Sequence, residues 1–323
     1  MLELALGNIK LKSRVFLAPM AGITDLPFRK IVRKFGDFMM YSEMVASHAV
    51  IRDAKRTRKM MDVVDDEFTS VQLVGADPKI MAEAAKVAHD LGARFLDINM
   101  GCPVKKIIKS DAGSALMKNE KLAAEIISSI VKSVPIPVTL KMRLGWDAEH
   151  KNVANMARIA QDSGISMIAV HGRTRSQLYS GKADWMAVAE VKQYVGDVPI
   201  IINGDIIDVD SAEMALKESG ADGVMIGRGA LGRPWNLKYI HDYLCCGLRP
   251  GLDPSSQAKY EIAAQHMEYM FEFYQSETAI KLARRVLMYY CKGNREATIL
   301  RRDIVSLDTV NKIYEMLNRI FLD

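Results

Sequence analysis

The sequence predicts an α/β protein, a (β/α)8 TIM barrel that is followed by a small C-terminal α-helical bundle. Eight short apolar runs rich in β-branched residues recur at wide intervals along the first part of the chain. Segments with apolar residues at spacings of three and four, which indicate amphipathic helices, separate these runs. Parallel strands need long crossovers, and eight strand–helix units close on themselves into a barrel.

The expected strands are short, and several of the helical patterns between them end in a glycine. Gly92, Gly164 and Gly220 each stand shortly before the next strand, where a left-handed glycine commonly ends a helix. The expected strands cover residues 15–18, 38–41, 71–74, 95–98, 138–141, 167–170, 200–202 and 223–226. The clearest helical patterns cover residues 78–91, 121–133, 153–163, 185–195 and 209–218.

The pattern changes beyond the barrel. Residues 248–254 contain two prolines and a glycine and are expected to form a linker. Apolar stripes at helical spacing then predict helices over residues 255–274, 277–292 and 307–321. We therefore expect a barrel domain at residues 1–245 and a helical domain at residues 246–323.

Composition narrows the class of protein. The 323 residues contain no apolar run of about 18 residues and no secretory signal, which predicts a cytoplasmic protein without a membrane partner. The four cysteines are not spaced as paired metal ligands or as a disulfide framework, so no metal is expected. The net charge of +5 favours an anionic partner, although a solvated surface of mixed charge explains it almost as well.

The most informative stretch is Asn99-Met100-Gly101-Cys102-Pro103, which follows the fourth expected strand. Gly101 tolerates backbone angles forbidden to other residues and Pro103 fixes its own, so Cys102 is held in one direction on a stiff loop. A thiol held in this way can deliver a proton or attack a substrate. Taken alone, however, a free cysteine is more often a small buried hydrophobe.

Two glycine-containing motifs, called the glycine pairs below, follow the seventh and eighth expected strands. They are Asn203-Gly204-Asp205 and Gly227-Arg228-Gly229. Parallel barrels often bind a phosphate at these two strand ends through backbone N–H groups. Each pair alone is equally consistent with an ordinary tight turn, but both together favour phosphate.

Two further polar residues end expected strands. Lys141 is flanked by apolar residues, and a buried ammonium without an anionic partner is costly. The anionic partner of Lys141 is either a ligand or, as the alternative, the carboxylate of Glu43 or Asp97 in a structural ion pair. His171 stands beside Gly172 and indicates a site role, although a hydrogen-bonded core histidine is the alternative.

These motifs resemble those of the tRNA-dihydrouridine synthases, most closely those of the bacterial B type. The resemblance spans nearly all of the expected barrel in the right order and spacing, whereas the helical tail matches only in size and type. The matching motifs are Leu17-Ala18-Pro19-Met20-Ala21-Gly22 with Asp25 and Phe28-Arg29, Val71-Gln72-Leu73, Asp97-Ile98-Asn99-Met100-Gly101-Cys102-Pro103, Gly113-Ser114-Ala115-Leu116, Lys141-Met142-Arg143-Leu144-Gly145, His171-Gly172-Arg173-Thr174, Asn203-Gly204-Asp205-Ile206 and Gly227-Arg228-Gly229.

The resemblance implies a flavin-dependent oxidoreductase that reduces the C5=C6 bond of specific uridines in the tRNA D-loop to 5,6-dihydrouridine. FMN would be the bound cofactor and NADPH the electron donor, and Cys102 would be the catalytic proton donor. A donor must be protonated at neutral pH, as a thiol with an ordinary pKa of about 8.5 mostly is. The implied FMN contacts are Pro19, Met20, Ala21, Gln72, Lys141, His171, Asn203, Gly204, Asp205, Gly227 and Arg228.

The implied substrate requires an RNA-binding surface, because a uridine must leave its stack to reach a flavin inside a barrel mouth. Basic clusters at residues 52–59, 105–109 and 281–302 are candidates, although runs of charge usually mark solvated faces. No dinucleotide-binding fingerprint occurs, so we expect NADPH to visit the flavin transiently. We also expect the chain to be a monomer. The expected substrate and tRNA contacts are Asn99, Arg143, Arg173, Lys281, Arg284 and Arg285.

Three other functions remain consistent with a parallel barrel. The nearest is an FMN-dependent dehydrogenase of a small molecule, similar to dihydroorotate dehydrogenase. A second is a phosphosugar isomerase or aldolase without flavin, in which Lys141 acts as a base or forms a Schiff base. The third is a tRNA-binding protein without catalysis, which the fold alone does not exclude.

Overall fold

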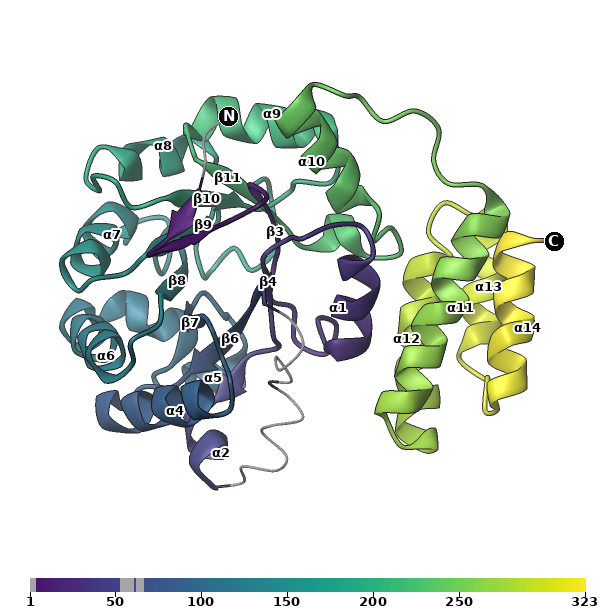
Figure 1. Cartoon of the computed structure of the whole chain (residues 1–323), viewed down its shortest axis with the longest axis horizontal. Helices are drawn as coiled ribbons and strands as arrows, with labels where there is room; N and C mark the ends of the chain where they lie inside the picture. Colours follow the sequence, from purple (N-terminus) through teal and green to yellow (C-terminus); the bar gives the residue numbers. More distant parts are fainter. Residues whose placement is uncertain (1–3, 53–60, 62–66) are drawn as a thin grey trace.

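Eight parallel strands form the barrel of the computed structural model, which describes residues 4–52, 61 and 67–323 (Figure 1). They follow one another around the sheet in the order β3-β11-β10-β9-β8-β7-β6-β4, and a parallel bridge between Phe16 and Met39 joins its two ends. The predicted (β/α)8 barrel is therefore confirmed. Its strands are β3 (Val15–Leu17), β4 (Met40–Tyr41), β6 (Thr69–Val74), β7 (Leu96–Met100), β8 (Val138–Arg143), β9 (Met167–His171), β10 (Ile200–Asn203) and β11 (Gly223–Ile226).

Along each strand, side chains point alternately into the interior of the barrel and outward to the surrounding helices. Phe16, Ile201 and Met225 pack with Leu6 in one buried cluster, whereas Val224 belongs to the cluster that the helices cover. Leu6 comes from an antiparallel hairpin that the sequence analysis did not predict, and it covers the end of the barrel at which the strands begin. The hairpin consists of β1 (Ala5–Leu6) and β2 (Ile9–Lys10), and a further short strand, β5 (Val45–Ala46), pairs with the end of β6.

The helices around the barrel begin and end close to the predicted positions. Gly92, Gly164 and Gly220 all have positive φ angles, of 99°, 90° and 60°, as expected of glycines that end helices. Asp77 begins one helix by accepting hydrogen bonds from two backbone N–H groups of its first turn. The barrel helices are α1 (Leu26–Arg33), α2 (Ser47–Arg52), α4 (Pro78–Asp90), α5 (Lys105–Ile108), η1 (Gly113–Lys118), α6 (Glu120–Ser133), α7 (Val153–Asp162), α8 (Met186–Lys192), α9 (Val209–Ser219), η2 (Arg228–Ala230) and α10 (Asn236–Cys246).

The C-terminal tail consists of helices with a hydrophobic core of their own. The sequence analysis predicted three helices here, and the structure adds a fourth, α13, which buries only Leu300 and Ile304 and so leaves a weak pattern. The division into an FMN-binding and a tRNA-binding domain stays a prediction. The tail helices are α11 (Ser256–Phe273), α12 (Ser276–Tyr290), α13 (Ala297–Ile304) and α14 (Val310–Phe321).

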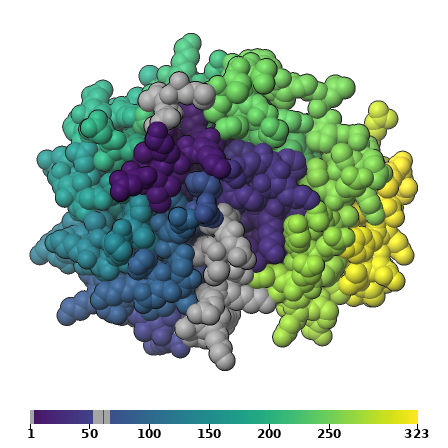
Figure 2. Space-filling model, viewed as in Figure 1, coloured from purple at the N-terminus to yellow at the C-terminus, as the bar shows by residue number. Residues whose placement is uncertain are grey.

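The tail packs against one side of the barrel, where α11 lies along α1 (Figures 1 and 2). The rings of Phe28 and His266 lie 5.6 Å apart between these helices, and Tyr274 Oη donates to Asp25 Oδ2 at 2.8 Å. None of the helices in the described part of the chain combines the length and apolar character that crossing a bilayer requires.

We expect Gly232→Ala to destabilise the protein more than Gly220→Ala does. Both glycines have left-handed backbones, for which an alanine costs about 1–2 kcal/mol. A Cβ at Gly232 would also lie 2.3 Å from the carbonyl oxygen of Tyr289 in α12, whereas a Cβ at Gly220 meets nothing within 4 Å. The overlap adds about 1–3 kcal/mol. Urea unfolding followed by circular dichroism measures both, and equal losses would contradict the observed packing of the tail on the barrel.

Candidate active site

A cavity of about 720 Å³ opens at the carboxyl ends of the strands, within the range of about 300–1,000 Å³ typical of small-molecule sites. The structure brings the expected catalytic and cofactor residues together there, while Arg173, Lys281, Arg284 and Arg285 do not line the cavity. Its lining includes Cys102, Asn99, Arg143, Pro19, Met20, Ala21, Gln72, Lys141, His171, Asn203, Gly204, Asp205, Gly227 and Arg228.

Lys141 is a buried cation that forms no salt bridge within the described part of the chain. Its side chain projects from β8, is only 8 % exposed, and donates from Nζ to Asn203 Oδ1 at 3.0 Å. Burial, together with the charge of Arg143, lowers the pKa of the ammonium to about 8. No carboxylate among the described residues forms a salt bridge with it, so the direct ion pair with Glu43 or Asp97 is not formed, although the negative charge of Asp97 raises the pKa of the ammonium.

Those two carboxylates have other partners. Glu43 Oε1 accepts a hydrogen bond from the backbone N–H of Gly22. Asp97 accepts from Gln72 Nε2 and from Thr139 Oγ1, both at 2.6 Å, and burial raises its pKa to about 6. The ammonium of Lys141 therefore lines the cavity without a salt bridge, and only the nearby charge of Asp97 partly offsets its own.

A chain of buried hydrogen bonds runs from Asp97 to the cysteine loop. Gln72 donates to Asp97 and accepts from Asn99 Nδ2 at 2.8 Å. Asn99 Oδ1 in turn accepts from the backbone N–H groups of Gly101, at 3.3 Å, and of Cys102, at 2.9 Å. Asn99, expected as a substrate contact, thus orients the loop that carries the thiol.

Cys102 is partly buried and lines the cavity, so it is not a residue of the apolar core. Its carbonyl oxygen accepts from Ser114 Oγ at 2.8 Å, and Arg143 Nε donates to the preceding carbonyl, that of Gly101, at 2.8 Å. Burial raises the pKa of the thiol more than the charges of Arg143 and Lys141 lower it. The thiol is therefore held in place and protonated at neutral pH.

The two glycine pairs form the opposite part of the cavity lining. Gly204 has a φ of +115°, and a Cβ there would lie 2.8 Å from the ring of His171, so only glycine fits. A Cβ at Gly227 would meet only Ala18 and Met20, both at 3.8 Å. The missing side chain at Gly227 thus leaves open space beside the cavity.

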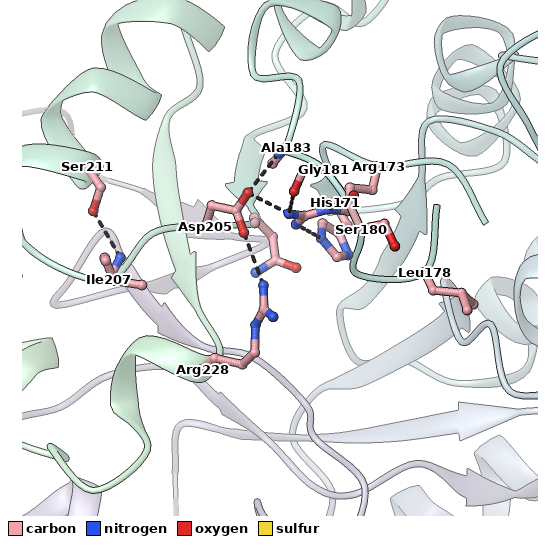
Figure 3. A network of polar contacts seen from close by, with 12 residues as sticks. His171, Arg173, Leu178, Ser180, Gly181, Ala183, Asp205, Ile207, Ser211 and Arg228 are labelled. Atoms are coloured by element: carbon pink, nitrogen blue, oxygen red, sulfur yellow. Dashed lines mark hydrogen bonds and ion pairs between the residues drawn. The ribbon is translucent and has the colours of Figure 1, made fainter. Parts of the chain in front are cut away.

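Asp205 ties two arginines to this region (Figure 3). Its Oδ2 accepts from Arg173 Nη2 at 2.6 Å and from the backbone N–H of Ala183 at 2.8 Å, and its Oδ1 accepts from Arg228 Nη2 at 3.1 Å. Arg173 also donates to the carbonyls of Ser180 and Gly181. Arg173 therefore supports the lining residue Asp205 from outside the cavity, and its expected contact with substrate stays a prediction.

His171 is a neutral member of a cationic group. Burial and the nearby charges of Lys141, Arg143, Arg173 and Arg228 lower its pKa well below the usual value. Arg173 Nη1 donates to His171 Nε2 at 3.3 Å, as Figure 3 shows, which places the ring proton on Nδ1.

The cavity lining includes two tyrosines that the sequence analysis missed. Tyr179 follows β9 on an exposed loop, and its ring lies 5.1 Å from the guanidinium of Arg228. Tyr289 comes from the end of α12, and Lys292, which belongs to the predicted basic cluster of the tail, lies just beyond it, so the tail contributes to the cavity. An exposed aromatic residue beyond a strand end was a usable signal for Tyr179, whereas nothing local marked Tyr289.

The other expected tRNA contacts lie elsewhere and stay predictions. Lys281 is exposed on α12, Arg284 Nε donates to the carbonyl of Leu307 at 2.5 Å, and Arg285 donates to the carbonyl of Gly22. Arg143, besides lining the cavity, donates to backbone carbonyls. Within the described ranges no cluster of three His, Cys, Asp or Glu side chains could hold a metal ion. The cluster residues Lys55, Arg56, Arg58 and Lys59 lie outside the described residues.

The parallel barrel and the cavity at the carboxyl ends of its strands place the chain in the (β/α)8 class of folds, whose active sites lie at this face. Histamine dehydrogenase from Rhizobium sp. 4-9 has a similar fold, with a TM-score of 0.57 and 13 % sequence identity over 83 % of this chain and half of that one. The model of the family Dihydrouridine synthase (Dus) matches residues 16–321, and the chain belongs to this family.

Curated relatives match most of the chain. A probable tRNA-dihydrouridine synthase of Rickettsia conorii is 46 % identical over 89 % of this chain and 87 % of its own length. The tRNA-dihydrouridine synthase B of Vibrio vulnificus is 39 % identical over 98 % of both chains, and that of Pseudomonas aeruginosa is 41 % identical over 88 % of this chain and 86 % of its own. The resemblance found in the sequence motifs is confirmed.

We expect Cys102 to titrate above a free thiol, because burial raises its pKa. Iodoacetamide labelling of Cys102 as a function of pH, followed by peptide mass spectrometry, gives the midpoint, with N-acetylcysteine labelled in parallel as the reference. A midpoint below the reference would show that Arg143 and Lys141 favour the thiolate, and would contradict a protonated thiol at neutral pH.

Proposed function

We propose that this protein is an FMN-dependent, NADPH-driven oxidoreductase that reduces the C5=C6 bond of specific D-loop uridines in tRNA to 5,6-dihydrouridine. The observation that carries the proposal is the presence, in one cavity, of a protonated thiol and a buried ammonium that forms no salt bridge with any described carboxylate. Membership in the Dihydrouridine synthase family favours reduction of tRNA over the three alternative functions, which are those of a small-molecule dehydrogenase, an isomerase or aldolase, and a non-catalytic tRNA-binding protein.

The residues present fit FMN. Lys141 needs a ligand that carries negative charge, and the open space at Gly227 beside Arg228 suits a phosphate group. The cavity of about 720 Å³ is large enough for a cofactor. In this proposal Gly204, Gly227 and Arg228 hold the phosphate, with Asp205 fixing Arg228.

The remaining cofactor contacts follow from the same lining. Pro19, Met20 and Ala21 offer an apolar wall for the flavin ring, and Lys141 and Gln72 contact its polar edge. His171, which stays neutral, provides a hydrogen-bonding group that does not repel the cations around it. When bound, FMN accepts two electrons from NADPH and supplies them, with one hydrogen, to C6 of the uracil ring.

Cys102 completes the reduction by giving its proton to C5. The S–H bond breaks, the C5–H bond forms, and the thiolate then regains a proton from water, so each uridine consumes one NADPH and one proton. Burial keeps the thiol protonated before the transfer, and the charges of Arg143 and Lys141 stabilise the thiolate after it. The hydrogen bonds from Asn99 and Ser114 to the loop hold the donor in place.

The tRNA is proposed to lie across the cavity opening, with its contacts shared by the barrel at residues 1–245 and the tail at residues 246–323. Lys105, Lys106 and Lys109 are exposed just beyond the cysteine loop, and Lys281 and Lys292 are exposed on the tail. Cations on both sides of an opening can hold the RNA backbone while a single base enters.

The test is incubation of the purified protein with FMN, NADPH and unmodified tRNA, followed by nucleoside mass spectrometry for uridine that has gained two hydrogens. We expect Cys102→Ala to keep the FMN affinity and to lose about 100- to 10,000-fold in turnover, the range for a general acid. Cys246→Ala, which removes an exposed thiol on α10, is the control and should leave turnover unchanged. Loss of FMN from Cys102→Ala, or wild-type protein that leaves uridine unaltered, would refute the proposal.

A further inference from the structure

Helix α12 of the tail rests on two loops that line the active-site cavity. The carbonyl of Tyr289 packs against Gly232, beyond β11, so closely that a Cβ at Gly232 would overlap it. One turn earlier, Arg285 Nη2 donates to the carbonyl of Gly22 in the loop between β3 and α1. Since β3 and β11 are neighbours in the barrel, the helix bridges two adjacent loops.

Gly22 is fixed through both of its backbone polar groups. Its carbonyl accepts from Arg285, and its N–H donates to the carboxylate of Glu43. The φ of Gly22 is +70°, and a Cβ there would lie 2.8 Å from Arg285 Nη1. The guanidinium therefore sits directly on the glycine, in space that any side chain at this position would occupy.

The loop fixed in this way is the wall assigned to the flavin ring. Met20 and Ala21 precede Gly22 and line the cavity, as does Ile23 after it. Tyr274 of the tail makes a second contact, because its hydroxyl donates to Asp25 at the start of α1. Several tail residues thus contact the segment that follows β3, and among the hydrogen bonds of the described residues it is that of Arg285 that reaches the stretch between the cavity-lining Ala21 and Ile23.

We propose that Arg285 is a positioning residue for the cofactor, which sets the β3–α1 loop through Gly22 and makes the helical tail part of the FMN site. The inference rests on the proposed function. This role differs from the direct contact with tRNA that the sequence analysis expected for Arg285, because the guanidinium already donates to the carbonyl of Gly22 in the barrel. Loss of the charged hydrogen bond leaves the Gly22 carbonyl without its donor and lets the wall shift away from the ring.

The chain supplies a matched control in the adjacent residue. Arg284 is also partly buried on α12 and also donates to a backbone carbonyl, but that carbonyl belongs to Leu307 within the tail. Arg284→Ala therefore removes a comparable hydrogen bond without touching the barrel. Arg285→Lys keeps one charged donor within reach of Gly22.

The test measures the Kd for FMN by quenching of flavin fluorescence in the full-length protein. We expect Arg285→Ala to raise the Kd for FMN roughly tenfold, which corresponds to the loss of one charged hydrogen bond. Arg285→Lys should recover part of the lost affinity. Arg284→Ala should leave the Kd for FMN unchanged. The same variants are assayed for the KM for tRNA. Circular dichroism verifies folding, and Arg285→Lys carries the test if the alanine variant is unfolded.

Two outcomes would overturn this inference alone. One is a Kd for FMN that stays within about twofold of wild type in Arg285→Ala while the KM for tRNA rises, which indicates an RNA contact. The other is equal weakening of FMN binding in Arg284→Ala and Arg285→Ala, which indicates a general effect of tail stability. Wild-type protein that binds no FMN would instead refute the proposed function and this inference with it.

Discussion

The ammonium of Lys141 is the feature on which the chemistry of the cavity depends. It is buried, it bonds to a neutral amide, and each carboxylate near it is engaged by other donors. Asp97 accepts from Gln72 and Thr139, and Asp205 holds two arginines. The charge of Asp97 offsets part of the cost of burying this cation, and the negative charge of the proposed cofactor would offset more of it.

The same polar network keeps the thiol and the cation in fixed relation. Strand β7 carries Asp97 and Asn99, and the neighbouring strand β8 carries Lys141 and Arg143. The two strands are paired so that Asn99 lies opposite Lys141. Asn99 and Arg143 bond to the backbone of the cysteine loop, so the strands that carry the positive charge also hold Cys102, the proposed proton donor. Strand pairing therefore sets the geometry of the proposed reaction, and the loops need little freedom of their own.

Most of the barrel and of the cavity lining could be predicted from the sequence, because both leave local patterns. Apolar runs mark strands, and polar or glycine residues at their carboxyl ends gather at one face of a parallel barrel, which is why Lys141, Asn203 and Gly227 were found. The partners of Arg143 and Arg173 could not be predicted. Apart from Asp205 and His171, which bond to Arg173, they are backbone carbonyls, and a carbonyl exists at every position, so no residue type records which carbonyl an arginine contacts.

The tail shows the same limit. Its helices were predicted from apolar stripes, apart from the short α13, but the seating of α12 on the barrel depends on tertiary packing. Tyr289 and Lys292 enter the cavity, and Arg285 reaches Gly22, only because Gly232 lets the helix approach. The hairpin under the barrel escaped prediction for a related reason, since two strands of two residues carry almost no periodic signal.

The most direct test of the central claim is the pH dependence of the Kd for FMN, compared between wild type and Lys141→Met. In the protein without ligand, burial lowers the pKa of Lys141 to about 8. A bound anion would raise this pKa, so FMN binds more tightly when the ammonium is protonated. The account predicts constant affinity just below that pH, a fall of up to about tenfold per pH unit above it, and weaker, pH-independent binding over this range in the variant. Wild-type affinity that stays level through that pH, or a variant that binds FMN as tightly as wild type, would contradict it.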